Sequence, residues 1–336
     1  MPKVSICLPN FNTAKYLAER LDSIFAQTFQ DWELIVYDSF SDDGSWEIFQ
    51  TYANKDQRMQ IHQGTRDGIY AGFNSSIAKA NAELVYIATS DDTMMPDCLE
   101  KMVAALDEHP ECGLCQCALE IIDENSQPHD WQWQKFPLGR FAPEWILQPH
   151  VRPKPMDGIL HCILQTIYTS ITQLLVRRRV FDQYGMFETQ WGSVADFEWG
   201  MRIGLLESCI YIPDVLATWR VHPEQATGNT ATALSRMQIL QMARFALTKA
   251  CQYNPSLVEN IPPTRTLLEF YEEQIVSLGI NECLGRLAKL KFLLSQIIQG
   301  NQSALSLLLQ ERTLTSFSEA SQFQRLKSLI ANPEFY

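Results

Sequence analysis

The chain has 336 residues, of which 46% are hydrophobic and 20% charged, a composition that is typical of globular proteins and excludes wholesale disorder. At about 150 residues per domain, this length predicts two domains, or one large domain with an appendage. The 27 Lys and Arg against 39 Asp and Glu give a net charge of −12. This charge argues against a nucleic-acid-binding protein, because such a protein needs a basic surface.

The charge is unevenly distributed along the chain. Residues 1–225 carry 17 Lys and Arg against 31 Asp and Glu, whereas residues 226–336 carry 10 against 8, which predicts a boundary near residues 227–230. The first residues lack a basic segment followed by an apolar one, and no run of 18 apolar residues occurs. We therefore expect neither a signal peptide nor a membrane span, and predict a cytoplasmic protein.

Short β-rich runs alternate with amphipathic runs over the first 122 residues. Strands are predicted over residues 4–8, 32–37, 59–62, 84–89 and 112–122. Helices are predicted over residues 15–27, 45–53, 70–80 and 96–107. This alternation predicts an α/β fold, with βαβ units and a mostly parallel sheet.

Residues 123–155 break the pattern and are predicted to form a long loop, rich in Pro, Trp and Gln, that is either functional or disordered. Its tryptophans, which include Trp131, Trp133 and Trp145, either form a binding lip or pack the loop against the body. Helices are then expected over residues 156–168, 177–184 and 196–207, and strands over 171–176, 209–212 and 215–221. Residues 226–336 are expected to be helical, with helices near 234–250, 267–278, 284–298 and 317–330.

Acidic residues follow two of the predicted strands, at the sheet edge where ligands of such folds bind. Asp38 follows the strand at 32–37, and Asp91 and Asp92 follow the strand at 84–89. Adjacent carboxylates ionise together only with a cation or hydrogen-bond donors nearby, and Mg²⁺ or Mn²⁺ is commonly held by one or two carboxylates plus substrate phosphates. The alternative is that Asp92 only begins a helix.

Three of the nine cysteines, Cys112, Cys115 and Cys117, lie close together in the sequence. They fall within an alternating apolar run and lack a second Cys or His pair at zinc spacing. Buried thiols on a core strand are therefore expected rather than a metal site.

Several segments, taken together, resemble the family 2 glycosyltransferases. Residues 4–12 look like the family's opening strand and loop, 23–36 like its first helix and second strand, and Asp67-Gly68-Ile69-Tyr70 like a segment common in members that build surface polysaccharides. Ser90-Asp91-Asp92 falls where the family has its metal-binding acidic motif. Further along, residues 178–202 look like the acceptor side, and Trp219-Arg220-Val221-His222 like the closing strand.

The resemblance implies a GT-A nucleotide-sugar-binding fold over residues 1–225, with a nucleotide-sugar half at 1–122 and an acceptor half at 123–225, followed by a helical extension over 226–336. It implies metal-dependent, inverting transfer of a sugar from a nucleotide diphosphate sugar, with a UDP-sugar favoured, to a carbohydrate or lipid-linked acceptor in polysaccharide or glycan assembly. The implied cofactor is Mn²⁺ or Mg²⁺. No nucleic-acid partner is expected.

The resemblance also implies roles for eight residues. Asp196 is the catalytic base, which takes the proton of the acceptor hydroxyl late in the transfer. Asp92 and His222 hold the metal, and Asp91 contacts the ribose. Pro9, Phe11 and Asp38 line the pocket for the nucleotide base, and Arg66 reaches the diphosphate.

The sequence departs from the family pattern at Ser39 and Ala195, where the family carries Asp and Glu. The first departure leaves the specificity for the nucleotide base open, and the second makes Glu198 the alternative base. Asp196 is otherwise only an acidic residue favoured in the first turn of a helix. His222 is either a ligand of the metal or phosphate or a satisfied residue at a strand end, and Arg177-Arg178-Arg179 is a solvated helix start or acceptor-side patch rather than a phosphate clamp.

Two other functions are considered beside the transferase. A sugar nucleotidyltransferase would have a Gly-rich, basic triphosphate loop near the first strand, and residues 9–13 are neither Gly-rich nor basic. The changes at Ser39 and Ala195 are also consistent with a non-catalytic glycan- or nucleotide-binding protein on a degenerate scaffold.

Basic and apolar residues interleave in the helical extension. Arg286, Lys289 and Lys291 alternate with Leu284, Leu287, Leu290, Phe292 and Leu294. Such a helix either contacts an anionic membrane surface at the inner face of the membrane or packs against neighbouring helices or a second subunit. Packing is the reading that we favour.

Overall fold

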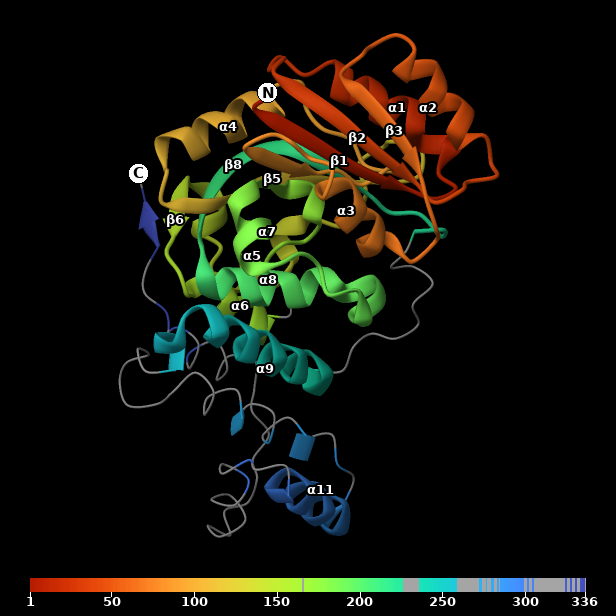
Figure 1. The fold of residues 1–336 in the computed structure, drawn as a ribbon. Helices are drawn as coiled ribbons and strands as arrows, with labels where there is room; N and C mark the ends of the chain where they lie inside the picture. The colour runs from red at the N-terminus through yellow and green to blue at the C-terminus, as the bar shows by residue number, and fades with distance from the viewer. Residues whose placement is uncertain are drawn as a thin grey trace.

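The computed structural model describes residues 1–164, 166–225, 236–258 and 285–298, and a few further positions (272–273, 276, 279–280, 283, 301, 304, 324, 327, 330 and 333–335). This part of the chain is an α/β structure built on a nine-stranded sheet, with helices packed against the sheet (Figure 1). The strand order is β3-β2-β1-β4-β7-β5-β8-β6-β9. All of these strands except β7 and β6 run in the same direction, as the sequence predicts.

The N-terminal elements confirm the predicted alternation, with ends that differ by up to three residues. They are β1 (Val4–Asn10), α1 (Ala14–Phe25), β2 (Trp32–Asp38), α2 (Ser45–Ala53), β3 (Met59–Gln63), α3 (Ile69–Ile77), β4 (Leu84–Ile87) and α4 (Cys98–Glu108). β1 lies between β2 and β4 and is parallel to both, so the carboxyl ends of these three strands meet at one edge of the sheet.

The second half of the sheet begins with β5 (Cys112–Ile122). Later in the chain come α6 (Met156–Leu164), the 3₁₀ turn η3 (Ile171–Gln173), the strand β7 (Leu174–Arg177), α7 (Arg178–Tyr184) and α8 (Ala195–Leu206). β7 runs antiparallel between β4 and β5 and thereby joins the two halves. The two strands predicted at 209–212 and 215–221 form one strand, β8 (Ser208–Arg220). Its pairing with β5 shifts register around Cys117 and Ala118, so that an irregularity accommodates Pro213 within a continuous strand.

The prediction of a structureless loop over residues 123–155 is wrong. This segment holds the 3₁₀ turns η1 (Trp133–Lys135) and η2 (Trp145–Leu147), the short helix α5 (Pro137–Phe141) and the strand β6 (His150–Arg152), which pairs with β8. Trp145 is buried against Phe141, whereas Trp131 is 52% exposed. Of the two alternatives predicted for the tryptophans, packing against the body therefore applies to Trp145, and exposure at the surface applies to Trp131.

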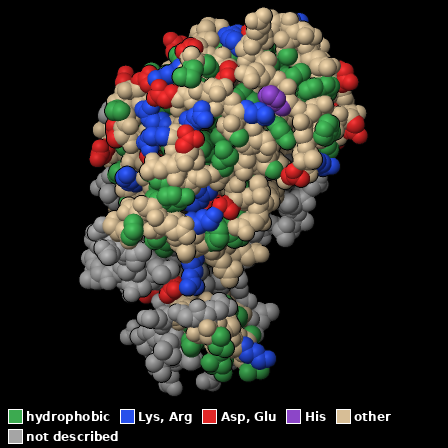
Figure 2. Space-filling model, viewed as in Figure 1, with side chains coloured by type: hydrophobic (Ala, Val, Ile, Leu, Met, Phe, Trp, Pro, Cys, Tyr) green, Lys and Arg blue, Asp and Glu red, His purple; other side chains and the backbone are tan. Residues whose placement is uncertain are grey.

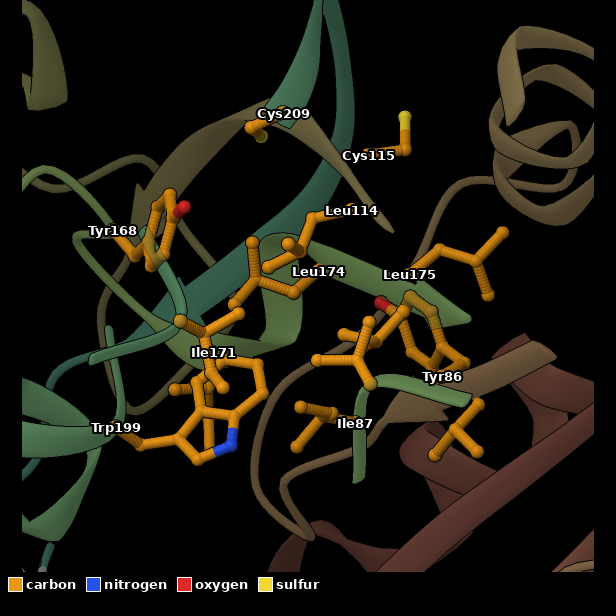
Figure 3. Packing of buried hydrophobic residues seen from close by; sticks show 14 of the residues in the cluster. Tyr86, Ile87, Leu114, Cys115, Tyr168, Ile171, Leu174, Leu175, Trp199 and Cys209 are labelled. Carbon is orange, nitrogen blue, oxygen red and sulfur yellow. The ribbon is translucent and has the colours of Figure 1, made fainter. Parts of the chain in front are cut away.

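The main core fills the space between the sheet and its helices. Figure 3 shows side chains of β4, β5 and β7, among them Tyr86, Leu114 and Leu175, packed together with Trp199 of α8. Trp199 stacks on Phe181 with 5.4 Å between ring centroids. Seven of the nine cysteines are buried and none forms a disulfide, and those on β5 are core thiols, as predicted. Among the described residues, no group of three His, Cys, Asp or Glu side chains could hold a metal ion.

Two long helices of the predicted extension fall within the described residues. α9 (Arg236–Tyr253) contributes apolar side chains to the main core, and is followed by η5 (Pro255–Val258). In α11 (Arg286–Ile298), Leu293 is buried in a separate small cluster, whereas Leu287, Leu290 and Leu294 are exposed. Figure 2 shows hydrophobic side chains over α11 at the bottom of the view.

Two of the helices predicted in the extension, near 267–278 and 317–330, lie almost entirely outside the described residues. Leu284 also lies outside them. A short strand, β9 (Glu334–Phe335), closes the edge of the sheet beside β6. No described helix is both long and apolar enough to cross a membrane.

A buried ion pair fixes the position of α8. Arg202, 1% exposed, donates from Nε to Glu198 Oε1 at 2.8 Å and from a terminal nitrogen to the Met186 carbonyl, also at 2.8 Å. It also donates to the carbonyl of Tyr184, the last residue of α7. These bonds tie α8 to the end of α7 and to the loop that follows it.

We predict that Arg202→Met lowers the free energy of unfolding by about 3–5 kcal/mol, because it leaves Glu198 as a buried, unpaired charge. Urea unfolding measures the change. Arg178→Met is the matched control, since Arg178 forms an exposed pair with Asp182 at 3.7 Å and its loss should cost less than about 1 kcal/mol. Equal losses in the two variants would contradict this role.

Candidate active site

A cavity of about 360 Å³ opens at the sheet edge where β1, β2 and β4 end. Its walls come from both halves of the sequence: the segments after β1, β2 and β4, the start of α3, the 3₁₀ segment η4 (Thr189–Val194) and the residues after β8. The lining side chains include Pro9, Asn10, Phe11, Ser39, Arg66, Tyr70, Ser90, Asp91, Ser193, His222 and Glu224. This is the position at which open α/β sheets bind ligands.

The cavity wall formed by the end of β1, its loop and the segment between β3 and α3 carries three of the five predicted donor-binding residues. Pro9, Phe11 and Arg66 line the cavity, and the Arg66 guanidinium lies 3.6 Å from the centroid of the Phe11 ring. This cation–π contact holds a planar cation at the cavity wall, in reach of an anionic ligand.

Asp38 does not line the cavity, although it was predicted to. It is fully buried, and its carboxylate accepts hydrogen bonds from Asn10 Nδ2 at 2.8 Å and from the Ser41 hydroxyl at 2.5 Å and backbone N–H at 3.0 Å. These bonds hold together the loops after β1 and β2. Its neighbour Ser39 lines the cavity instead.

The two carboxylates after β4 point in different directions. Asp91 lines the cavity, and its Oδ2 lies 3.0 Å from His222 Nε2, while the buried Nδ1 of the same ring has no hydrogen-bond partner among the described residues. Asp92 is 1% exposed and does not line the cavity; its Oδ1 accepts the Arg220 backbone N–H at 2.7 Å, and its Oδ2 accepts the Thr89 hydroxyl. Burial and the charge of Asp91 raise the pKa of Asp92 to about 7.

Arg220 supports this acidic motif from the end of β8. It is fully buried, donates to the Asp91 carbonyl and to Glu19 Oε2, each at 2.7 Å, and also bonds the Asp123 carbonyl and the Ser126 hydroxyl. The sequence places Arg220 near the motif. Its role as the cation that fixes the motif's backbone follows only from the structure.

Asp196 lies in the first turn of α8, beside the cavity. It is half-buried and is not a lining residue. Burial raises the pKa of Asp196 to about 6, and interactions with Tyr70, which does line the cavity, and with backbone N–H groups oppose that rise. The local sequence gives no signal of the interaction between Asp196 and Tyr70.

The alternative residues of the acceptor side are engaged elsewhere. Glu198 is fully buried against Arg202, so it does not reach a ligand, and Ala195 is buried in the core. Arg177 is also buried and bonded to the Cys112 and Leu106 carbonyls, so the prediction of a solvated surface is wrong for this residue. Neither Arg177 nor its two Arg neighbours line the cavity.

Comparison with known proteins identifies the family. The model of glycosyl transferase family 2 matches residues 5–184, which is more than half of the chain. The chain belongs to this family. It is therefore a glycosyltransferase, and neither the nucleotidyltransferase nor the non-catalytic reading is retained.

Two curated relatives illustrate the range of similarity. A glycosyltransferase of Rickettsia typhi, RT0329, is 26% identical over 240 residues, which cover 71% of this chain and 70% of that protein. TuaG of Bacillus subtilis, named for teichuronic acid biosynthesis, is 27% identical over 130 residues, 38% of this chain and 51% of its own length. Across the curated relatives, the matched segments span between 35% and 73% of the relative's length.

Solved structures show the same GT-A fold. S. aureus TarS 1–349 in complex with UDP-GlcNAc aligns with a TM-score of 0.57 and 16% identity over 83% of this chain and 73% of that one. The mannosyltransferase PcManGT from Pyrobaculum calidifontis, in complex with GDP-Man and Mn²⁺, aligns with a TM-score of 0.53 and 18% identity over 97% and 85%. At these identities the likeness establishes the fold.

The raised pKa of Asp196 predicts a pH-dependent gain in stability for Asp196→Asn. Because its pKa is about 6 in the folded state against an ordinary 3.8, the wild type loses stability as pH rises from about 4 to 6 and keeps that loss above pH 6. The Asn variant carries no such charge and should unfold at a higher temperature at pH 8, with the difference vanishing near pH 4. Thermal unfolding across this pH range checks it, and an equal difference at both ends would contradict the assignment.

Proposed function

We propose that this glycosyltransferase moves a sugar from a nucleoside diphosphate sugar to a hydroxyl acceptor, with a divalent metal and with inversion at the anomeric carbon. One observation carries the proposal: a single cavity is lined by Asp91 and His222, and also by residues of η4, the segment that leads directly into Asp196 at the start of α8. A site for the leaving group and a base for the nucleophile therefore flank the same space.

The donor is proposed to be a nucleoside diphosphate sugar, with a UDP-sugar favoured. The complexes of TarS with UDP-GlcNAc and of PcManGT with GDP-Man support this class of donor. On the wall of this chain, Pro9 and Phe11 offer an apolar surface for a nucleotide base, and Arg66 offers a planar cation for the diphosphate. Asp38 acts by holding these loops, and Ser39 is the side chain placed to contact the base.

The cavity wall formed by Asp91 and His222 fits a metal site whose ligands come partly from the protein and partly from the bound diphosphate. Asp91 and His222 supply one carboxylate and one imidazole, Nδ1 of His222 has no hydrogen-bond partner among the described residues, and Asp92 adds acidic charge behind them. Because the described residues offer no cluster of three ligands, Mn²⁺ or Mg²⁺ fits here when diphosphate oxygens complete the coordination. When bound, the ion offsets the negative charge that develops on the leaving diphosphate. We assign the metal-facing role to Asp91 and His222, with Asp92 as their support. This differs from the sequence-based assignment of Asp92 to the metal and Asp91 to the ribose, because Asp92 is buried and Asp91 lines the cavity.

Asp196 is proposed as the base that accepts the proton of the attacking hydroxyl. It lies at the α8 side of the cavity, apart from the metal wall, as attack on the face opposite the leaving group requires. A carboxylate with a pKa of about 6 is ionised at neutral pH and is a stronger base than an ordinary Asp.

The acceptor is proposed to be a carbohydrate or a lipid-linked glycan in polysaccharide assembly. The name of TuaG supports this class of product. In the proposed division of the chain, residues 1–122 bind the donor, residues 123–225 the acceptor, and residues 226–336 form the helical extension, of which α9 joins the main core.

We predict metal-dependent release of nucleoside diphosphate from a panel of UDP-GlcNAc, UDP-glucose and GDP-mannose. With Mn²⁺ the wild type should turn over at least one donor, and Asp91→Asn should lower the rate at least about 100-fold because an interaction with the leaving group is lost. Asp97→Asn is the control, since Asp97 forms an exposed pair with Lys101. Full turnover in EDTA, or in Asp91→Asn, would refute the metal-dependent mechanism.

We also predict that UDP and Mn²⁺ tighten each other's binding, because neither fills the site alone and such coupling is reciprocal. Calorimetric titrations of Mn²⁺ with and without UDP, and of UDP with and without Mn²⁺, measure the coupling. His222→Ala should reduce it, whereas His109→Ala should not, because His109 lies in the turn between α4 and β5 and is paired there with Glu111. Independent binding of the two ligands would contradict the shared site.

A further inference from the structure

The imidazole ring of His222, which lines the cavity, makes a single hydrogen bond among the described residues. Its Nε2 lies 3.0 Å from Asp91 Oδ2, and its buried Nδ1 has no partner there. The backbone N–H of His222 donates to Gln225 Oε1 at 3.0 Å, which holds the chain but not the ring. Because the χ2 torsion of histidine has broad minima, one hydrogen bond does not fix the plane of the ring, and packing must do so.

Tyr16, in the first turn of α1, packs against this imidazole. The residue is 5% exposed and does not line the cavity, although Thr13, just before the helix, does. The centroids of the Tyr16 and His222 rings lie 4.8 Å apart, with 49° between the ring planes. Rings at this separation are in direct contact, so the imidazole cannot turn without displacing the ring of Tyr16.

Arg220 holds the ring of Tyr16 in turn. The guanidinium carbon lies 4.8 Å from the centroid of that ring, which is a cation–π contact. The same guanidinium is fully buried and donates to the Asp91 carbonyl and to Glu19 Oε2, each at 2.7 Å. Glu19 lies three residues after Tyr16, so one face of α1 offers Arg220 both a carboxylate and an aromatic ring. Tyr16 therefore rests on a side chain that is itself fixed by hydrogen bonds.

We propose that Tyr16 is a positioning residue for His222, and that its ring keeps the imidazole in the orientation in which it meets Asp91 at the cavity. The inference rests on the proposed function, since it concerns the wall assigned there to the metal and the diphosphate. Arg220 supports both the Tyr16 ring and the Asp91 backbone, so one buried cation holds the two metal-facing residues in place. Tyr16 acts through His222 and is not itself assigned a contact with a ligand.

The test measures how strongly Mn²⁺ tightens the binding of UDP, by calorimetric titration of UDP with Mn²⁺ and in EDTA. Tyr16→Leu should lower this factor at least about five-fold and leave the UDP affinity in EDTA within about two-fold, because only the metal-facing imidazole is released. A merely structural role of Tyr16 would weaken UDP binding in EDTA as well. If Tyr16→Leu does not fold, Tyr16→Met takes its place, since a flexible thioether fills the space without a ring.

Two further variants are the controls. Tyr16→Phe keeps the ring and should keep the factor, which separates the ring from the hydroxyl. Tyr52→Leu removes a ring that contacts Lys55 Nζ at 5.3 Å on α2, away from the cavity lining, and should also leave the factor unchanged.

A double-variant cycle with His222→Ala tests the contact without metal or nucleotide. The shift in unfolding temperature of the double variant should differ from the sum of the shifts of Tyr16→Leu and His222→Ala, as expected for side chains in contact. Additive shifts would overturn the inference, and so would an unchanged factor in Tyr16→Leu when His222→Ala lowers it; both results leave the metal site in place. A wild type that binds Mn²⁺ and UDP independently would instead overturn the proposed metal site, and the role of Tyr16 with it.

Discussion

The pairing of two carboxylates at the end of β4 is the constraint on which the site depends. Asp91 and Asp92 are adjacent, and Asp92 is almost completely buried, so the protein must supply donors and positive charge around them. Arg220 supplies a backbone N–H to Asp92 and holds the Asp91 carbonyl with its side chain. Arg20 is fully buried on α1, and its guanidinium has no hydrogen-bond partner in the part of the chain that the structure describes; it adds a cation whose charge lowers the pKa of Asp92.

The contacts of Arg220 and His222 with the acidic motif make the two halves of the sheet depend on each other. Arg220 and His222 come from the end of β8 and the residues after it, whereas the acidic motif that they contact follows β4. β7, which follows residue 122, pairs with β4 and β5, which precede it, and α9 adds its apolar face to the same core. The proposed division near residue 122 therefore does not separate two folding units.

The alternation of strands and helices could be predicted because it depends on local periodicity and turn residues. Which of two neighbouring side chains faces the cavity could not, because this depends on how each strand end turns. At the end of β2, Asp38 turns inward and Ser39 faces the cavity; after β4, Asp91 faces it and Asp92 turns inward. The contact between His222 and Asp91 joins distant parts of the chain and has no local signal. β6 was missed because it is only three residues long and includes Arg152, whose buried charge is balanced by Asp157 at 2.6 Å.

The cysteines have a consequence for how this protein meets oxidants and alkylating reagents. Burial raises the pKa of the Cys7 and Cys112 thiols to about 12 and also raises that of Cys115 well above its ordinary value, so that almost no thiolate exists at these positions in the native state to react. Of the nine cysteines, two are partly exposed, Cys251 and Cys283, and both follow β8 in the chain. A reagent that modifies more than two thiols therefore reports that the buried core has opened.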